Sequence, residues 1–204
     1  MITRHATTVH NVSLWISALA CCVAAGCASA PPDRFYTLGN LPATAGQDAP
    51  VGVNVTITSL TIPELVDRPQ LVLRTGANRV AVLDHQRWAE RLQTGIGRVI
   101  ATDLAALLGI TGVGLPGQRS SNQPGVLVAV DIVRFDSALN GMVQIEARWS
   151  IRSAVGSAPA IGTANVQEIS GASVEEVISA HDRALGRISG ELARVVRQVV
   201  AARH

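Results

Sequence analysis

Alternation between apolar and polar residues predicts the strands of this chain, most clearly over residues 143–152. The alternating apolar positions there are Val143, Ile145, Ala147, Trp149 and Ile151, and the residues between them are polar or charged. A period of two is typical of a strand with one buried and one solvated face. Residues 51–58 alternate in the same way. Residues 126–137 are apolar on both faces, which favours a central position in a sheet.

Turn residues separate the other predicted strands. Two short apolar runs, residues 70–74 and 79–83, flank Thr75-Gly76-Ala77-Asn78, where glycine and asparagine favour a hairpin. Asn140-Gly141 is a strong hairpin signal after the strand at 126–137. Residues 161–169 are predicted to be the third strand of the meander that follows.

Two segments have apolar residues at helical spacing. The first predicted helix has Asp84 as its N-cap and ends at Gly109. Its apolar stripe consists of Trp88, Leu92, Ile96, Val99, Ile100, Leu104, Leu107 and Leu108. The second opens with a capping box at Ser173–Glu176 and runs to about residue 202. A glycine costs roughly 1 kcal/mol in an exposed helix interior, so we expect Gly186 and Gly190 to mark close packing.

The element order is three strands, a helix, three strands and a helix (β-β-β-α-β-β-β-α). This order predicts an α+β fold in which an antiparallel or mixed sheet carries two long amphipathic helices on one face. It also suggests two related halves, although the sequence shows no repeat.

The first 27 residues differ in character from the rest. Residues 14–26 carry no charge, which suits a signal-peptide core but falls short of the roughly 20 residues of a membrane-spanning helix. Small residues then precede Cys27, as in a bacterial lipobox. We therefore predict a lipoprotein signal peptide at 1–26, a lipidated Cys27 with a flexible tether over 27–50, and a single α+β domain over 51–204.

A conventional secretory signal cut after Ala30 is the alternative, but Pro31 directly after the cut would be unfavourable. Ala28, instead of aspartate, follows the cysteine. By resemblance to enterobacterial sorting rules, this implies transfer to the outer membrane. The predicted location is the outer membrane of a Gram-negative bacterium, with a lipid anchor and the domain facing the periplasm.

Composition argues against several classes of protein. With 48% hydrophobic residues the chain has enough aliphatic side chain for a core and is not intrinsically disordered. The net charge is only +2 and aromatic residues make up 3%, so we expect no nucleic-acid partner. All three cysteines lie within the first 27 residues, and we therefore expect no disulfide in the mature protein.

Motifs for catalysis, metals and cofactors are weak. Gly112–Gly117 formally matches G-x-G-x-x-G, but it follows a predicted helix rather than a strand, so a glycine-rich loop explains it better. The histidines do not have metal-ligand spacing, and we expect His85 and His181 to be solvated or capping residues. The sequence has no hydrolase signature such as G-x-S-x-G. We predict no enzyme activity, no metal and no cofactor.

The densest group of distinctive residues lies between Asp67 and Glu90. Taken alone, it predicts a strand, a turn, a strand and a helix start, with Trp88 packing the helix on the sheet. The group also resembles the ABC-type transport auxiliary lipoprotein family. The pattern is carried by Tyr36-Thr37-Leu38, Arg68-Pro69-Gln70, Asn78-Arg79-Val80 and Arg87-Trp88-Ala89-Glu90, in the family's order. Arg91 departs from the proline of many relatives.

The resemblance implies an outer-membrane lipoprotein that docks the periplasmic conduit of an ABC/MCE-type lipid transport system. Its partners would be an MCE-domain protein and, through it, an inner-membrane permease and ATPase. The resemblance also suggests ring-like homo-oligomers. The candidate contacts to the partner are Arg68, Gln70, Arg74 and Asn78. The residues of the motif expected to be structural are Tyr36, Pro69, Arg87, Trp88 and Glu90.

Two alternative functions remain open at this point. A stand-alone periplasmic lipid-binding carrier would need an enclosed apolar cavity. A lipoprotein hydrolase would need a nucleophile and a base that converge in a pocket.

Overall fold

The computed structural model describes residues 31–40, 49–117, 125–156 and 158–202. The chain divides into two compact units at Pro32, and the elements below belong to the second unit, Asp33–His204. Cys27 and the predicted signal peptide lie outside the described residues. No helix within the described ranges is long and apolar enough to cross a membrane.

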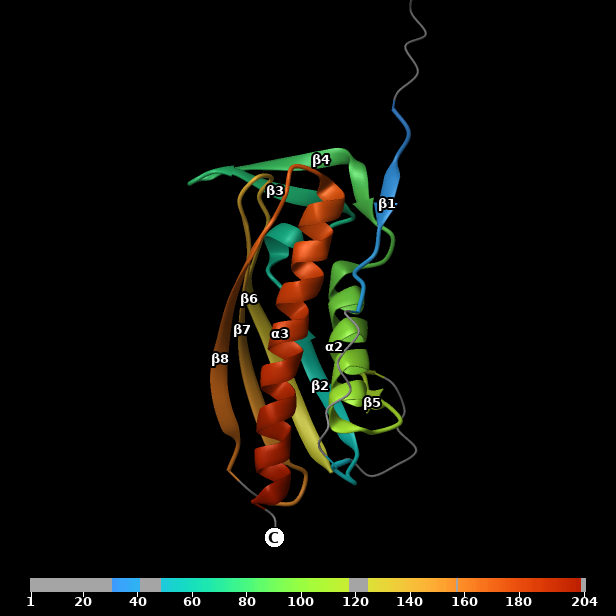
Figure 1. Ribbon diagram of the computed structural model, residues 1–204, viewed down its shortest axis with the longest axis vertical. Coiled ribbons are helices and arrows are strands. Elements are labelled where there is room, and N and C mark those ends of the chain that lie inside the picture. The colour runs from blue at the N-terminus through green and yellow to red at the C-terminus, as the bar shows by residue number, and fades with distance from the viewer. Residues whose placement is uncertain (1–30, 41–48, 118–124, 157, 203–204) are drawn as a thin grey trace, which may run out of the picture. The chain divides into compact units, whose positions relative to one another are not determined.

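A five-stranded mixed sheet forms the larger part of the fold (Figure 1). In spatial order its strands are β5 (Val113–Gly114), β2 (Val55–Thr61), β6 (Val126–Asp136), β7 (Met142–Ser153) and β8 (Ala160–Ile169). β2 runs parallel to β5 and β6, whereas β6, β7 and β8 form an antiparallel meander. The predicted meander and the central position of β6 are confirmed, because β6 lies between β2 and β7.

A second, three-stranded sheet lies at one end of the first. Its strands are β1 (Arg34–Tyr36), β4 (Arg79–Trp88) and β3 (Gln70–Gly76), in that spatial order. β3 and β4 form the predicted hairpin, and β1 adds in parallel to the other side of β4. The α+β class is confirmed, but the strands divide between two sheets instead of one.

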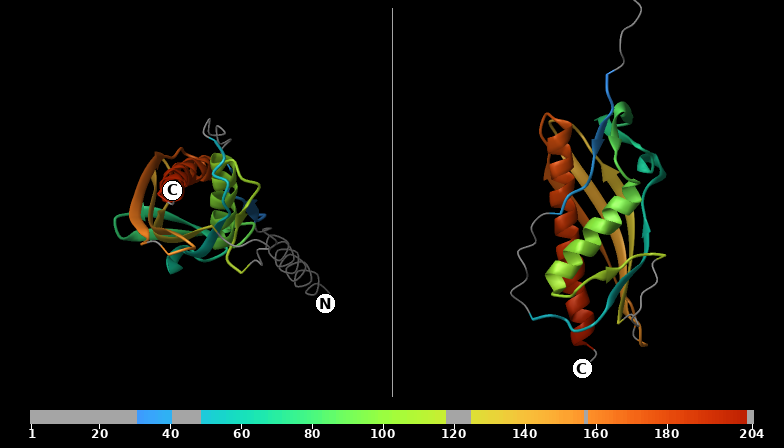
Figure 2. Two further views of the ribbon diagram at one scale, coloured as in Figure 1. Left: turned by 90° about the horizontal axis from the view of Figure 1, so that it is seen from below. Right: turned by 90° about the vertical axis from the view of Figure 1, so that its right-hand side faces the viewer.

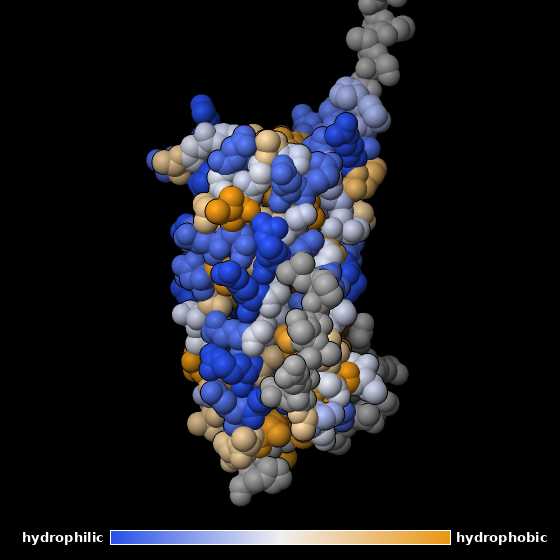
Figure 3. Space-filling view, in the orientation of Figure 1, coloured by the Kyte–Doolittle hydropathy of each residue, from blue (hydrophilic) through white to orange (hydrophobic). Residues whose placement is uncertain are grey.

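Both long helices cover the same face of the five-stranded sheet (Figure 2). They are α2 (Leu92–Leu108) and α3 (Val174–Ala201), and a short 3-10 turn, η1 (Glu64–Val66), precedes β3. The inward side chains of the strands and helices form one core, which includes the fully buried Ile57, Ile100 and Ile145. The outer face of α3 is largely hydrophilic (Figure 3), which is the pattern of an amphipathic helix at a surface.

The predicted start of the first helix is wrong. Asp84 is not an N-cap but lies within β4, and Trp88 ends that strand, so α2 begins only at Leu92. The strand continues because its backbone has partners on both sides: Trp88 N–H donates to the Pro69 carbonyl at 2.7 Å, and Ala89 N–H donates to the Tyr36 carbonyl at 2.8 Å. Pro69 and Tyr36 are both distant in sequence from Trp88 and Ala89, so the periodicity of the chain could not predict where this strand ends.

The second helix begins as predicted. The Ser173 side chain accepts from the Glu176 backbone N–H, and the Glu176 carboxylate accepts from the Ser173 N–H at 2.9 Å, which completes the capping box. The expected close packing at Gly190 is absent, since a Cβ atom built there would have no neighbour within 4 Å. Gly190 therefore faces open space, and its small size is not required by packing.

Candidate functional site

The motif residues of the sequence meet where β1 joins β4. β1 pairs with β4 in parallel, so that Tyr36 lies opposite Trp88. The backbone bonds from Trp88 to Pro69 and from Ala89 to Tyr36 connect three motif segments that are remote in sequence. The segments at 36–38, 68–70 and 87–90 therefore form one structural unit.

Tyr36 fastens β1 to its surroundings through its hydroxyl group. The hydroxyl donates to Gln86 Oε1 at 2.5 Å and lies 3.1 Å from Glu175 Oε1 on α3. Burial raises the pKa of the Tyr36 phenol, and the Glu175 carboxylate raises it further. The phenol consequently stays protonated and keeps its role as a hydrogen-bond donor.

Glu90 positions an arginine on the neighbouring helix. Its carboxylate accepts from Arg98 Nη2 at 2.7 Å, and the same Nη2 atom donates to the Leu38 carbonyl at 2.9 Å. Gly95 leaves room for this arrangement, since a Cβ atom there would lie 3.3 Å from Glu90 Oε1. Glu90 thus acts on the N-terminal segment through Arg98.

Further contacts hold the N-terminal segment along both helices. The Gly39 N–H donates to Asp182 Oδ1 on α3 at 2.9 Å, and the Asn40 amide donates to the Val99 carbonyl on α2 at 3.0 Å. Arg87, another charged motif residue, has its Nε atom 3.2 Å from Asp33 Oδ2. Residues 33–40 are therefore attached to the domain over their whole length.

A surface hollow, here called the motif groove, lies beside this junction. It is lined by Asp67, Arg68, Pro69, Trp88, Ala89, Glu90, Arg91 and Leu92 and has a volume of about 320 Å³. Arg68 is exposed, and the Arg91 side chain is 75% exposed, with its Nη2 atom 3.8 Å from Asp67. Two solvent-accessible guanidinium groups beside an apolar wall suit an acidic or amphipathic protein surface.

The structure does not bring the four candidate contact residues together. Arg68 lines the motif groove, and Gln70 is half-buried at the start of β3. Arg74 lines a separate hollow and forms an ion pair with Asp136 at 2.9 Å. Asn78 lies exposed in the turn between β3 and β4. Arg68 is therefore the candidate that shares a hollow with the motif residues Pro69, Trp88 and Glu90.

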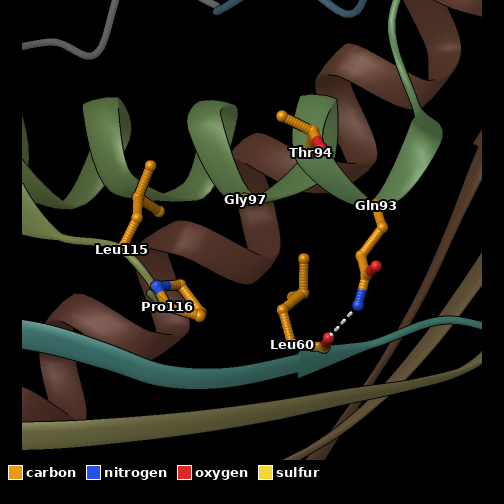
Figure 4. A pocket seen from close by; sticks show the side chains of 6 residues that line it. All are labelled: Leu60, Gln93, Thr94, Gly97, Leu115 and Pro116. Carbon is orange, nitrogen blue, oxygen red and sulfur yellow. Dashed lines mark hydrogen bonds between the residues drawn. The ribbon is translucent and has the colours of Figure 1, made fainter. Parts of the chain in front are cut away.

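A second groove, which the sequence did not suggest, lies between α2 and β2 (Figure 4). It is lined by Leu60, Gln93, Thr94, Gly97, Leu115 and Pro116 and has a volume of about 270 Å³. Gln93 Nε2 donates to the Leu60 carbonyl at 2.5 Å. The one feature of the sequence that could have indicated this groove is Gly97, which has no side chain to fill it. A groove of this size is just below the roughly 300–1,000 Å³ of ordinary ligand sites, and it is not the enclosed cavity that a lipid carrier requires.

Ser137 and His181 form a serine–histidine pair, but inside the core. Ser137 Oγ lies 2.7 Å from His181 Nε2, and the His181 ring is stacked on Phe135. His181 is completely buried, so its expected role as a solvated or capping residue is wrong. Burial lowers the pKa of His181 to about 3, and Nδ1 has no hydrogen-bond partner. Such a histidine is a weak base and lacks the carboxylate that orients a catalytic one.

Metal ligation gains no support from the described ranges, where no three His, Cys, Asp or Glu side chains are grouped closely enough to hold an ion.

Comparison with known proteins places these features in context. The family model described as ABC-type transport auxiliary lipoprotein component matches residues 36–193. A solved structure from Xanthomonas campestris, described as a DUF330 protein, is 16% identical with a TM-score of 0.68 and covers 84% of this chain and 99% of its own. Another, described as an uncharacterized protein, is 14% identical with a TM-score of 0.65 and covers 81% and 99%. The curated proteins contain no match.

Proposed function

Because the chain belongs to the ABC-type transport auxiliary lipoprotein family, we propose that it is a non-enzymatic accessory subunit of an ABC/MCE-type system for lipid transport between membranes. In this role it docks the periplasmic conduit at the outer membrane. The observation that carries the proposal is the family match over residues 36–193, which includes all four motif segments.

Anchoring in this proposal depends on Cys27. Acylation of the cysteine attaches the mature chain to the outer membrane, with the domain on the periplasmic side. Only six residue steps separate Cys27 from Asp33, and an extended chain spans about 3.4 Å per residue, or about 20 Å here. The fastening of residues 33–40 supports this role, because it keeps the domain close to its anchor.

The motif groove is the proposed docking surface for the MCE-domain protein. Arg68 and Arg91 are the exposed basic residues of the groove, and they would pair with acidic side chains of the partner. Gln70, Arg74 and Asn78 stay in the proposal as contacts outside the groove. The permease and the ATPase are reached through the MCE-domain protein, and a homo-oligomeric ring would multiply the number of grooves.

The test is affinity purification of the full-length lipoprotein from solubilised membranes of its own host, followed by mass spectrometry. We expect an MCE-domain protein together with permease or ATPase subunits. Recovery of the lipoprotein with no MCE-domain protein and no transporter subunit would contradict the proposed function.

Charge reversal tests the docking surface separately. Arg68→Glu combined with Arg91→Glu should reduce recovery of the MCE-domain protein about tenfold or more, because like charges would then face each other across the contact. Arg194→Glu is the matched control, since Arg194 is exposed on α3 and is not a lining residue of the groove. Unchanged recovery with the double variant would reject the groove while leaving the transport role to the first experiment.

A further inference from the structure

β8 is a free edge of the five-stranded sheet. It pairs with β7 on one side, and it is the last strand in the spatial order. Figure 1 shows β8 at the margin of the five-stranded sheet, with no other described strand of that sheet beyond it. The backbone groups on its outer edge are therefore open to another strand.

Most of the features that usually protect an edge strand are missing from β8. Such features are proline, lysine, a bulge or an inward charge. β8 is ten residues long, contains no proline or basic residue, and pairs with β7 without a register shift. Its one charged residue, Glu168, is an inward charge, and it is neutralised by Arg183 at 3.0 Å and Arg187 at 2.9 Å on α3.

The outward side chains of β8 are uncharged and end in two exposed isoleucines. In order they are Ile161, Thr163, Asn165, Gln167 and Ile169. Ile161 and Ile169 are each 75% exposed. Both lie four residues from Asn165, so the outward face of the strand is symmetric about this residue.

We propose that β8 pairs antiparallel with β8 of a second copy of this chain, about a two-fold axis at Asn165. In this register Ile161 of each copy lies opposite Ile169 of the other, and Thr163 lies opposite Gln167. Directly opposed side chains of an antiparallel pair are in contact, so both isoleucine pairs become buried. Asn165 faces its own symmetry mate, and the two sheets join into one.

Neighbouring two-fold registers lack this complementarity. A shift of the axis to Ala164 places Ile161 opposite Gln167 and leaves Ile169 beyond the partner strand. A shift to Val166 places Ile169 opposite Thr163 and leaves Ile161 without a partner. Only the axis at Asn165 buries both isoleucines and keeps the full strand paired.

Electrostatics are compatible with this pairing. Arg183 donates to the Ile169 carbonyl at 2.7 Å, which limits the free edge at that end. The arginines of the two copies lie at opposite ends of the paired strands, so they do not face one another. The contact is isologous and uses the same surface of both copies, unlike the heterologous contacts of a closed ring.

Disulfide trapping in membranes tests the proposal with the full-length lipoprotein. Asn165→Cys places two thiols across the axis at a Cα separation of about 4.5–5.5 Å, which a disulfide can bridge. Mild oxidation should convert most of the protein into a disulfide-linked dimer, and a reductant should return it to the monomer. The unsubstituted chain, which retains Cys27, provides the baseline.

Two controls define the register. Thr163→Cys alone should remain monomeric, because the two thiols would be about 13 Å apart along the strands, whereas Thr163→Cys with Gln167→Cys should crosslink. Glu146→Cys, on β7 opposite Asn165, should also remain monomeric. Crosslinking of Glu146→Cys without crosslinking of Asn165→Cys would reject the proposed contact, as would absence of dimer in both.

Substitution of Ile161 and Ile169 gives an independent test of the β8–β8 contact. Ile161→Lys with Ile169→Lys in the Asn165→Cys background should lower the rate of dimer formation about tenfold, because two apolar pairs are lost. Both side chains are exposed, so folding should be unaffected, and a thermal melt checks this. A folded variant that crosslinks as fast as its parent would overturn the proposal.

Discussion

Glu90 has its effect through a second side chain. Its carboxylate orients Arg98, and Arg98 then binds the Leu38 carbonyl. At the residue scale, this explains why a charged motif residue can be important without contacting a partner. The sequence identified Glu90 as part of a motif, but its link to residue 38 depends on Arg98 of α2, which contacts both Glu90 and the N-terminal segment.

His181 is a second case in which the environment decides the role of a residue. Its buried contacts, a hydrogen bond with Ser137 and a stacked ring with Phe135, are both with uncharged side chains. The folded protein therefore holds it neutral, with a pKa of about 3, while an unfolded chain protonates it near pH 6.5.

This difference predicts a pH dependence of stability. Between pH 6.5 and pH 3 the unfolded state binds the additional proton, so the contribution of His181 is complete above pH 6.5 and decreases as the pH falls, by up to about 1.4 kcal/mol per pH unit. His181→Gln removes this proton uptake. Urea unfolding at pH 7 and at pH 5 should show that the free energy of unfolding falls less between these two pH values for the variant than for the parent. An equal decrease in the free energy of unfolding for the two proteins would contradict the role of His181 as the group that takes up the proton on unfolding.

At the element scale, β4 differs from what its sequence suggested, whereas β8 agrees with it. β4 extends to Trp88 because it has a partner on each side, one of which, β1, comes from a segment predicted to be a tether. β8 follows its predicted bounds closely but has a partner on one side only. Periodicity indicates which face of a strand is buried, but it does not indicate which edges are paired.

Two glycines in regular elements should respond oppositely to alanine. A Cβ atom at Gly162 in β8 would lie 2.2 Å from Trp149 Cζ2, whereas one at Gly190 in α3 has no neighbour within 4 Å. Gly162→Ala should lower the free energy of unfolding by about 1–3 kcal/mol through overpacking. Gly190→Ala should raise it by about 1 kcal/mol through helix propensity.

Urea denaturation of both glycine variants beside the parent protein checks this pair of predictions. Changes of the same sign would show that the local packing around one of the two glycines has been misassigned.

At the scale of the whole molecule, the proposed lipid anchor would act through the short connection between Cys27 and Asp33. Residues 33–40 are attached to the three-stranded sheet and to both long helices through Tyr36, Gly39 and Asn40. A lipid anchor at Cys27 would therefore hold the folded domain near a membrane surface, within the reach of the few residues between them.

Loss of the anchor should release the protein. Cys27→Ala removes the acylation site, and without two or more acyl chains stable membrane attachment is lost. Cell fractionation should find the variant in the soluble periplasm. Cys22→Ala, which changes a residue within the predicted signal, is the matched control and should stay with the membranes. Retention of Cys27→Ala in the membrane fraction would refute anchoring at this residue.

The sequence alone determined the features that depend on local order. The meander from residue 126 to 169, the β3–β4 hairpin and the capping box at Ser173 follow from periodicity and turn chemistry, because each involves residues close in the chain. The family motifs were also recognisable in the sequence as ordered segments between Tyr36 and Glu90.

The tertiary structure decided what depends on distant partners. Tyr36 and Gln86 are 50 residues apart, and Ser137 and His181 are 44 apart, yet each pair forms a hydrogen bond. The division into two sheets, the burial of His181, the motif groove and the free edge of β8 all arise from such pairings. A pattern along the chain records whether a side chain is buried, whereas only the folded chain determines which group lies against it.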